Sequence, residues 1–185
     1  MRAWYLRRAI PWVALLGCCG TAGAAALLGA RWPTAEEALL PVLLAGCAAA
    51  AGFVFDEPLP SLAEVTPRGA TWRRTTRLTA VSIPTAVWWG AVAGRPGWLL
   101  AGSASIGLLA GLAALAGRRG IGAPGPALAA WVALAVFLPL VLSIMLGWPL
   151  VYPFGAVTTT IVTFWCAIAV LGALVLGLAL RPGLT

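Results

Sequence analysis

The chain has 185 residues, of which 62% are hydrophobic and 9% are charged, and its mean hydropathy is +0.98. This balance excludes a soluble globular domain, so a lipid bilayer is the solvent for most of the chain. The net charge of +7 comes from arginines that stand singly or in short groups at the ends of apolar runs, which argues against a nucleic-acid partner.

Six apolar runs follow one another along the chain, at residues 10–30, 38–55, 78–94, 97–117, 126–147 and 154–180. Each can cross a hydrocarbon core about 30 Å thick, which takes about 20 helical residues, although the third run is short and the sixth is long. We therefore predict an all-α, multi-pass membrane protein with six transmembrane helices in a single domain, residues 1–185.

The arginines are divided unevenly between the two sides that six crossings create. If the N-terminus is inside, ten arginines lie inside, namely Arg2, Arg7, Arg8, Arg68, Arg73, Arg74, Arg77, Arg118, Arg119 and Arg181. Only Arg31 and Arg95 then lie outside. Short cytoplasmic loops carry an excess of Lys and Arg, so the sequence predicts that both termini are cytoplasmic.

The first run has two possible interpretations. A basic start is followed by Leu15-Leu16-Gly17-Cys18, which loosely resembles the cleavage box of a bacterial lipoprotein and would make the run a removable signal. The apolar stretch continues past Cys18 to Ala30, however, and this is a full span. We therefore expect a first transmembrane helix rather than a signal.

A charged segment, which we call the elbow, lies between the second and third runs at residues 56–77. Within it, Ser61 and Glu64 fit a capping box at the start of a short helix that Pro67 ends. Two roles stay open: the elbow rests on anionic headgroups, or it docks a partner protein. The residues expected to contact a partner are Asp56, Glu57, Ser61, Glu64, Arg68, Trp72, Arg73, Arg74 and Arg77.

The fourth run carries small residues at every fourth position, Ser103, Gly107 and Gly111. Such a stripe lets another helix approach closely. We expect the stripe to pack against a helix of the same chain, and a contact between two copies is the alternative.

The last run begins with threonines, of which Thr159, Thr160 and Thr163 are candidates to line a substrate path. The plainer alternative is that their hydroxyls bond carbonyls of their own helix. The connection before this run, residues 148–154, is apolar and aromatic and contains two prolines. Its composition fits a tight interfacial hairpin and also fits a segment that re-enters the membrane.

Asp, Glu, His, Lys and Arg are missing from the middle of all six runs, although enzymes and ion-coupled transporters place such groups there. The chain has no His, and its cysteines match no metal site. It has no Lys to form a phosphate-binding loop. We therefore predict no enzymatic activity, no catalytic or metal-ligating residues and no cofactor, and if ATP drives this protein, a separate subunit binds it.

This layout resembles the membrane subunit of a bacterial ABC exporter with six helices. In that family the loop between the second and third helices carries a coupling helix that docks on the ATPase, and the connection between the fifth and sixth helices often re-enters the membrane. Here residues 55–58, 61–66 and 72–74 occupy the coupling position, and residues 148–154 the re-entrant one. The resemblance implies a bacterial inner-membrane permease subunit that moves a lipophilic or uncharged small molecule, driven by a separate ATP-hydrolysing subunit.

Two alternatives stay open. The chain also resembles the substrate-capturing subunit of vitamin-uptake transporters, although it has few side chains suited to the polar pocket that such subunits carry near their outer face. It also fits a non-transporting scaffold, or an assembly or immunity factor, that holds another membrane protein. The expected partners are the lipid bilayer and the ATP-hydrolysing subunit, with a second membrane subunit or a second copy of the chain in addition, and no nucleic acid.

Overall fold

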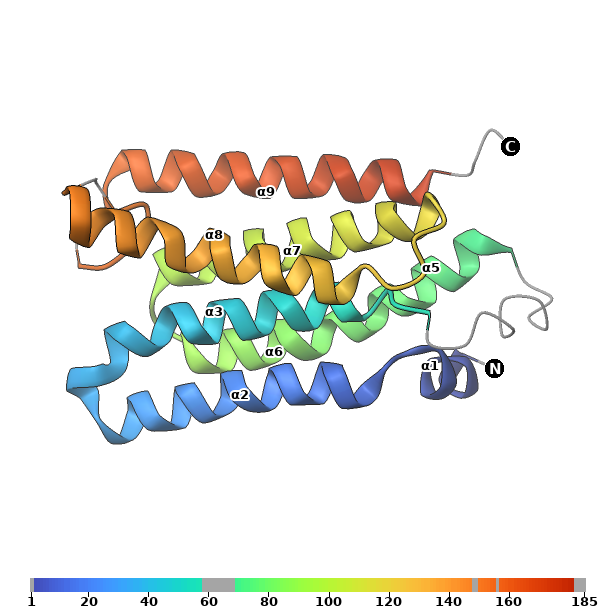
Figure 1. Cartoon of the computed structure of the whole chain (residues 1–185), viewed down its shortest axis with the longest axis horizontal. Helices are drawn as coiled ribbons and strands as arrows, with labels where there is room; N and C mark the ends of the chain where they lie inside the picture. The colour runs from blue at the N-terminus through green and yellow to red at the C-terminus, as the bar shows by residue number, and fades with distance from the viewer. Residues whose placement is uncertain (1, 58–68, 148–149, 156, 182–185) are drawn as a thin grey trace.

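The computed structural model describes residues 2–57, 69–147, 150–155 and 157–181, and these residues form helices and connecting segments with no strand among them (Figure 1). The helices are α1 (Arg2–Ala9), α2 (Trp12–Arg31), η1 (Pro33–Ala35), α3 (Glu36–Phe53), α5 (Ala70–Leu78), η2 (Thr79–Val81), α6 (Ser82–Ala91), α7 (Pro96–Arg118), α8 (Gly125–Leu146) and α9 (Thr159–Leu180). The predicted all-α class is confirmed for this part of the chain.

Five helical segments of the described chain are long and apolar enough to cross a membrane: Trp12–Arg31, Pro33–Phe53, Pro96–Arg118, Gly125–Leu146 and Thr159–Leu180. These segments overlap five of the six predicted runs, and they mark a multi-pass membrane protein. The third predicted run is divided among α5, η2 and α6, which follow one another without interruption from Ala70 to Ala91.

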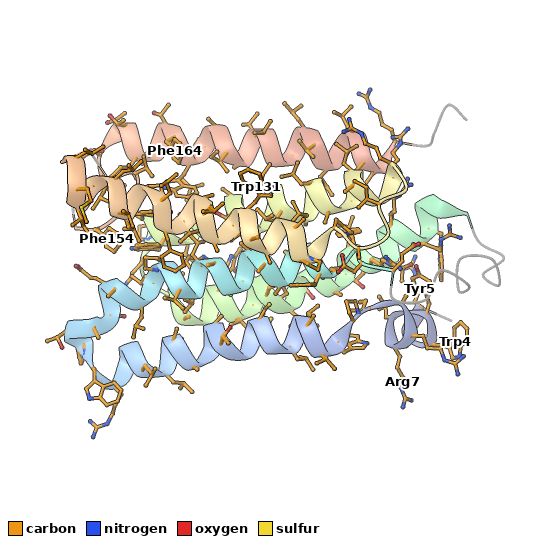
Figure 2. The ribbon with its side chains drawn as sticks, in the orientation of Figure 1. Trp4, Tyr5, Arg7, Trp131, Phe154 and Phe164 are labelled. Carbon is orange, nitrogen blue, oxygen red and sulfur yellow. The ribbon has the colours of Figure 1, made fainter. Side chains whose placement is uncertain are left out.

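The outer surface of the bundle is strongly apolar. Large hydrophobic side chains on α8 and α9 are turned outward, and Figure 2 shows Trp131 on α8 and Phe164 on α9. Trp131 is 68% exposed within the single chain. Large continuous apolar surface is unfavourable in water, so a bilayer around α8 and α9 accounts for it.

Pro11 sets the start of α2. Pro11 separates α1 from α2, so the first span begins at Trp12 rather than Ile10. The indole Nε1 of Trp12 donates to the carbonyls of Leu6 and Arg7, each at 3.2 Å. The Arg7 carbonyl has no amide four residues later, because residue 11 is proline, so the indole takes that place.

The last span begins later than the sequence predicted. The helix α9 starts at Thr159, where the hydroxyl of Thr158 accepts a hydrogen bond from the Ile161 amide at 3.4 Å. Residues 154 and 155 lie before this helix, although the apolar run includes them. The apolar run therefore begins a few residues before the helix, because apolar composition alone does not distinguish a packed connection from the helix that follows it.

The core of the bundle lies around α3, which packs against α2, α6, α7 and α8. The middle of α3 is built from small residues, and Cys47, Ala48, Ala50 and Ala51 are nearly or fully buried. Small side chains let neighbouring backbones approach closely in a membrane, where burial of apolar surface gives little drive to helix association.

The helices α7 and α9 lie along each other and meet at glycines (Figure 1). A Cβ added to Gly172 would stand 2.9 Å from the backbone nitrogen of Leu108, and one added to Gly111 would stand 3.2 Å from the carbonyl oxygen of Gly172. Gly111, from the predicted small-residue stripe, therefore lies at a contact within the chain. Ser103 lies elsewhere on α7, where its hydroxyl accepts from the Trp89 indole at 3.0 Å, and a Cβ at Gly107 would meet no atom within 4 Å.

The connection between α8 and α9 packs back into the bundle instead of lying free. Tyr152 is 3% exposed and its ring stacks on Trp98, with 5.9 Å between ring centroids. Its hydroxyl donates to the carbonyl of Val136 at 2.9 Å and lies 3.4 Å from the carbonyl of Ala135. Pro139 has no N–H, so the carbonyl of Ala135, four residues earlier, lacks its usual helical donor. The Tyr152 hydroxyl lies at this carbonyl.

Replacing Tyr152 by Phe should lower the free energy of unfolding by about 1 kcal/mol, because the ring can stay packed while buried carbonyls of α8 lose a donor. Unfolding in mixed micelles titrated with SDS measures this change. The matched control is Thr163→Val, which removes an exposed hydroxyl that donates to the Thr159 carbonyl of its own helix at 2.8 Å. Equal losses from the two substitutions would contradict the role given to Tyr152.

Candidate functional site

The described charges gather at the two ends of the bundle. At one end, α1 meets α5, where Arg77 bonds to Tyr5. The last turn of α9 lies beside α5, with Arg74 3.5 Å from the Ala179 carbonyl. The last turn of α7 lies beside that of α9, since Arg118 donates to the Leu178 carbonyl at 2.6 Å. We call this the arginine-rich end. It holds the described arginines Arg2, Arg7, Arg8, Arg73, Arg74, Arg77, Arg118, Arg119 and Arg181. The opposite end holds Arg31, Glu36, Glu37 and Arg95.

The guanidinium of Arg77 joins three segments that are distant in the sequence. It is buried, and its Nη1 donates to the carbonyls of Phe55 and Asp56 at 2.8 and 3.2 Å. Its Nε donates to the Tyr5 hydroxyl at 3.1 Å, and its Nη2 lies 3.5 Å from the Glu57 carboxylate. The five planar donors of a guanidinium suit such a junction, which we call the Arg77 node.

Asp56 extends this node to α8. Its carboxylate accepts a hydrogen bond from the Gly125 amide at 2.6 Å, at the start of α8, where amide groups lack helical partners and the helix dipole favours a negative charge. Burial raises the pKa of Asp56, against the opposite effects of the Gly125 hydrogen bond and the nearby Arg77. The Glu57 amide also donates to the Gly122 carbonyl, at 2.7 Å.

The close fit at this point depends on Gly125. A Cβ there would stand 2.4 Å from the Phe53 ring and 2.6 Å from the Asp56 carboxylate. The end of α3 therefore packs directly against the start of α8, because the buried Asp56 carboxylate bonds to the Gly125 amide and Gly125 has no side chain to keep the two apart.

Of the nine residues predicted to dock a partner, the structure buries two. Asp56 and Arg77 make the contacts just described within the chain. Glu57, Trp72, Arg73 and Arg74 are partly exposed, and Ser61, Glu64 and Arg68 lie outside the described residues, as does the predicted capping box. The docking role itself stays a prediction.

A small cavity of about 120 Å³ opens beside the node. It is lined by Phe55, Glu57, Arg73, Arg74, Arg77, Ala114 and Gly117. Burial, followed by the nearby charges of Arg118 and Arg73, lowers the pKa of Arg74. The elbow therefore adjoins α7 as well as α3, and cationic side chains crowd together where it does so.

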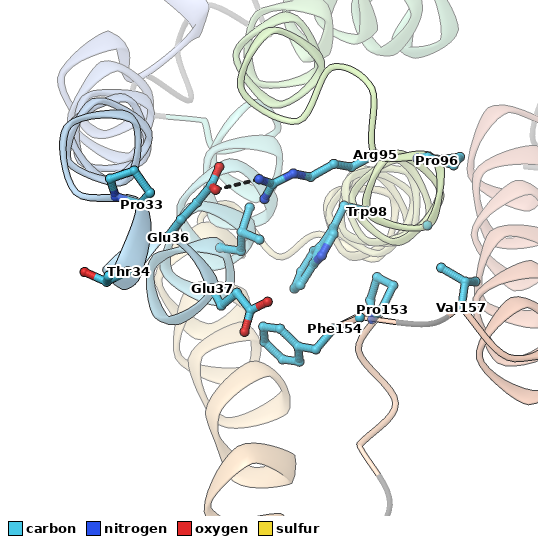
Figure 3. A pocket seen from close by; sticks show the side chains of 13 residues that line it. Pro33, Thr34, Glu36, Glu37, Arg95, Pro96, Trp98, Pro153, Phe154 and Val157 are labelled. Atoms are coloured by element: carbon cyan, nitrogen blue, oxygen red, sulfur yellow. Dashed lines mark ion pairs between the residues drawn. The ribbon is translucent and has the colours of Figure 1, made fainter.

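The opposite end of the bundle holds a cavity of about 490 Å³, which we call the distal cavity (Figure 3). Its polar side chains include Glu36, Glu37 and Arg95, and its aromatic walls are Trp98 and Phe154. Arg95 forms an ion pair with Glu36, drawn as a dashed line in Figure 3. The sequence predicted few side chains for a polar pocket, because Glu36 and Glu37 lie in the first turn of α3 whereas Arg95 lies far along the chain, directly before α7.

The threonines proposed to line a path lie on the surface of α9. Thr159, Thr160 and Thr163 are all exposed, and none lines the distal cavity. An apolar cavity of about 170 Å³ between α3, α7, α8 and α9 does not include them either. The hydroxyl of Thr163 bonds within its own helix, which is the plainer of the two alternatives that the sequence offered.

No cluster of three or more His, Cys, Asp or Glu side chains that could hold a metal ion occurs among the described residues. Comparison with family models, with curated proteins and with solved structures finds no match to this chain. The function is therefore inferred from the two ends of the bundle alone.

Proposed function

We propose that this chain is the transmembrane subunit of an ABC-type transporter, driven by a separate ATP-hydrolysing subunit that docks on the elbow. The chain crosses the inner membrane of a bacterium six times, with the arginine-rich end in the cytoplasm. It forms part of a path for a lipophilic or uncharged small molecule. The observation that carries this proposal is the Arg77 node, which ties the elbow to the transmembrane helices.

We count one composite span in addition to the five long helices, and this gives the six crossings that we propose. From α5 through η2 to α6 the chain stays helical over residues 70–91, and this stretch is about 33 Å long at 1.5 Å per residue. Its first turns carry arginines, which fit the headgroup region, and its later part is apolar. With six crossings, α1 and the end of α9 share one side, in agreement with the contacts that both make to α5.

The node supports a coupling role because its buried hydrogen bonds connect the elbow to three helices. A force on the elbow reaches α1 through Tyr5, α3 through Phe55 and α8 through Asp56. A loop held only by water would move without moving the helices, whereas packed segments with buried hydrogen bonds move together.

The double variant Arg73→Glu, Arg74→Glu tests docking on the elbow. Both side chains line the small cavity beside the node and lie in the predicted coupling position. Reversing them should abolish co-purification of an ATP-hydrolysing subunit from native membranes, because like-charged or mispaired groups across an interface cost several kcal/mol. Co-eluting proteins are identified by mass spectrometry.

The matched control is the double variant Arg7→Glu, Arg119→Glu. It removes the same charge from the same end, and both side chains are exposed outside the elbow, so any effect of charge on membrane orientation is shared. Figure 2 shows Arg7 pointing away from the bundle. Loss of the ATP-hydrolysing subunit in the control as well, or its absence from the unaltered protein, would contradict the proposal.

A second function, the substrate-capturing subunit of an uptake transporter, is favoured by the distal cavity. Its volume of about 490 Å³ lies in the range of small-molecule sites. Such a subunit binds its ligand before any ATP-hydrolysing partner is present. A chain purified alone that retains a small molecule on native mass spectrometry would favour this second function.

A further inference from the structure

The distal cavity has walls from three parts of the chain. The turn before α3 and the start of α3 form one wall, the start of α7 forms the second, and residues 153–155 and 157 form the third. Figure 3 shows the side chains of Glu37, Trp98 and Phe154 lying around the same space. The cavity lies at the end opposite the Arg77 node and does not include any residue of the elbow.

The charges that line this cavity do not cancel. Arg95 is paired with Glu36. The Glu37 side chain is exposed, and its carboxylate makes no hydrogen bond or ion pair with other described residues; in Figure 3 it points into the space beside Phe154. Arg31, the other arginine at this end, does not line the cavity. The lining therefore carries one negative charge in excess.

The aromatic wall is fixed in place. Trp98 is 4% exposed, and its ring packs edge-on against Phe154 with 5.2 Å between centroids. Tyr152 stacks on the same indole. The backbone of this region is also close-packed, because a Cβ added to Gly97 would stand 2.7 Å from Pro153. The buried Trp98 ring thus holds the partly exposed Phe154 in a position that does not have to be ordered when a ligand binds.

These features together select one class of ligand. We propose that the distal cavity binds an organic monocation, an ammonium group carried on an apolar or aromatic body. The ammonium group pairs with the Glu37 carboxylate and lies against the ring of Phe154, which is partly exposed and attracts cations through the ring quadrupole. An anion would meet Glu37 as a like charge, and a neutral molecule would gain no attraction from this carboxylate.

This site goes beyond the transport proposal, because binding here requires neither an ATP-hydrolysing subunit nor the elbow. The docking proposal and the distal-cavity proposal can therefore be contradicted independently. Docking is tested by co-purification, whereas the distal cavity is tested by direct binding to the full-length chain alone.

The probe is radiolabelled benzyltrimethylammonium, and its uncharged isostere is neopentylbenzene, in which carbon replaces the quaternary nitrogen. Equilibrium dialysis with the full-length protein in nanodiscs of zwitterionic lipid measures saturable binding. We expect one saturable site for the cation, and we expect neopentylbenzene at the same concentration not to compete. Glu37→Gln should weaken binding of the cation at least tenfold, because it removes the charge while keeping the shape.

Two controls separate the site from general effects. Thr34→Val alters a lining residue whose hydroxyl points away from the cavity in Figure 3, and it should leave binding unchanged. The melting temperature of Glu37→Gln should be close to that of the unaltered protein, because the exposed carboxylate makes no hydrogen bond or ion pair with other described residues. Non-saturable uptake of the probe, equal binding by Glu37→Gln, or full competition by neopentylbenzene would each overturn the proposal.

Discussion

Replacing Arg77 by Met will lower the free energy of unfolding by about 3 kcal/mol, which is the largest loss expected from a change of one charged residue in this chain. The substitution keeps an unbranched side chain of similar length. It removes the donors to the carbonyls of Phe55 and Asp56 and to the Tyr5 hydroxyl, and it leaves these acceptors buried. Unfolding in mixed micelles titrated with SDS measures the loss.

Two comparison variants show whether the loss comes from the node. Arg119→Met removes an exposed arginine from the same end of the bundle and should change stability by less than about 0.5 kcal/mol. Arg77→Lys keeps the positive charge but not the planar fork, so it should give an intermediate loss. If Arg77→Lys equals the unaltered protein, or Arg119→Met equals Arg77→Met, the node does not hold this end together.

Replacing Gly172 by Ala will force α7 and α9 apart and should cost about 2 kcal/mol of stability. The new Cβ would stand 2.9 Å from the Leu108 nitrogen and 3.1 Å from its Cα, and both are backbone atoms that no rotamer change can move. The same SDS titration measures the cost, and loss of protection of α7 amides from hydrogen exchange would locate it.

The matched control lies on the same helix. A Cβ at Gly177 meets no atom within 4 Å, so Gly177→Ala should be neutral or should stabilise α9 by up to about 1 kcal/mol through helix propensity. A loss in Gly177→Ala as large as that in Gly172→Ala would show that the effect comes from α9 itself and not from its contact with α7.

The long helices could be predicted because their signals are local. The run at 97–117 corresponds to α7 (Pro96–Arg118), with Pro at its first position and Arg in its last turn. The run at 126–147 corresponds to α8 (Gly125–Leu146), which ends at Gly147 with a φ of +68°. Apolar composition, a proline at the start and a glycine at the end are each visible within a few residues.

The Arg77 node could not be predicted, because an arginine near other charges is usually solvated. Its partners Tyr5, Phe55 and Asp56 lie up to 72 positions away, and a buried arginine is recognised only when its acceptors are known. The role of Tyr152 was hidden for a related reason, since the sequence shows Pro139 and Tyr152 but not that the connection folds back onto α8.

The distal cavity also depends on long-range placement. Glu36 and Glu37 follow the turn between α2 and α3, Arg95 lies in the turn between α6 and α7, and Phe154 comes from the connection before α9. Each side chain alone is consistent with a solvated loop. Their convergence on one space is a property of the packed bundle.

Labelling of intact cells with a membrane-impermeant maleimide tests most directly whether the arginine-rich end faces the cytoplasm. In a chain whose native cysteines, Cys18, Cys19, Cys47 and Cys166, are replaced by alanine, Gly69→Cys and Thr34→Cys each place one thiol at an exposed position at opposite ends of the bundle. We predict labelling of Thr34→Cys in intact cells and of Gly69→Cys only after permeabilisation. Labelling of Gly69→Cys from outside would contradict the orientation, and with it an ATP-hydrolysing partner on the elbow.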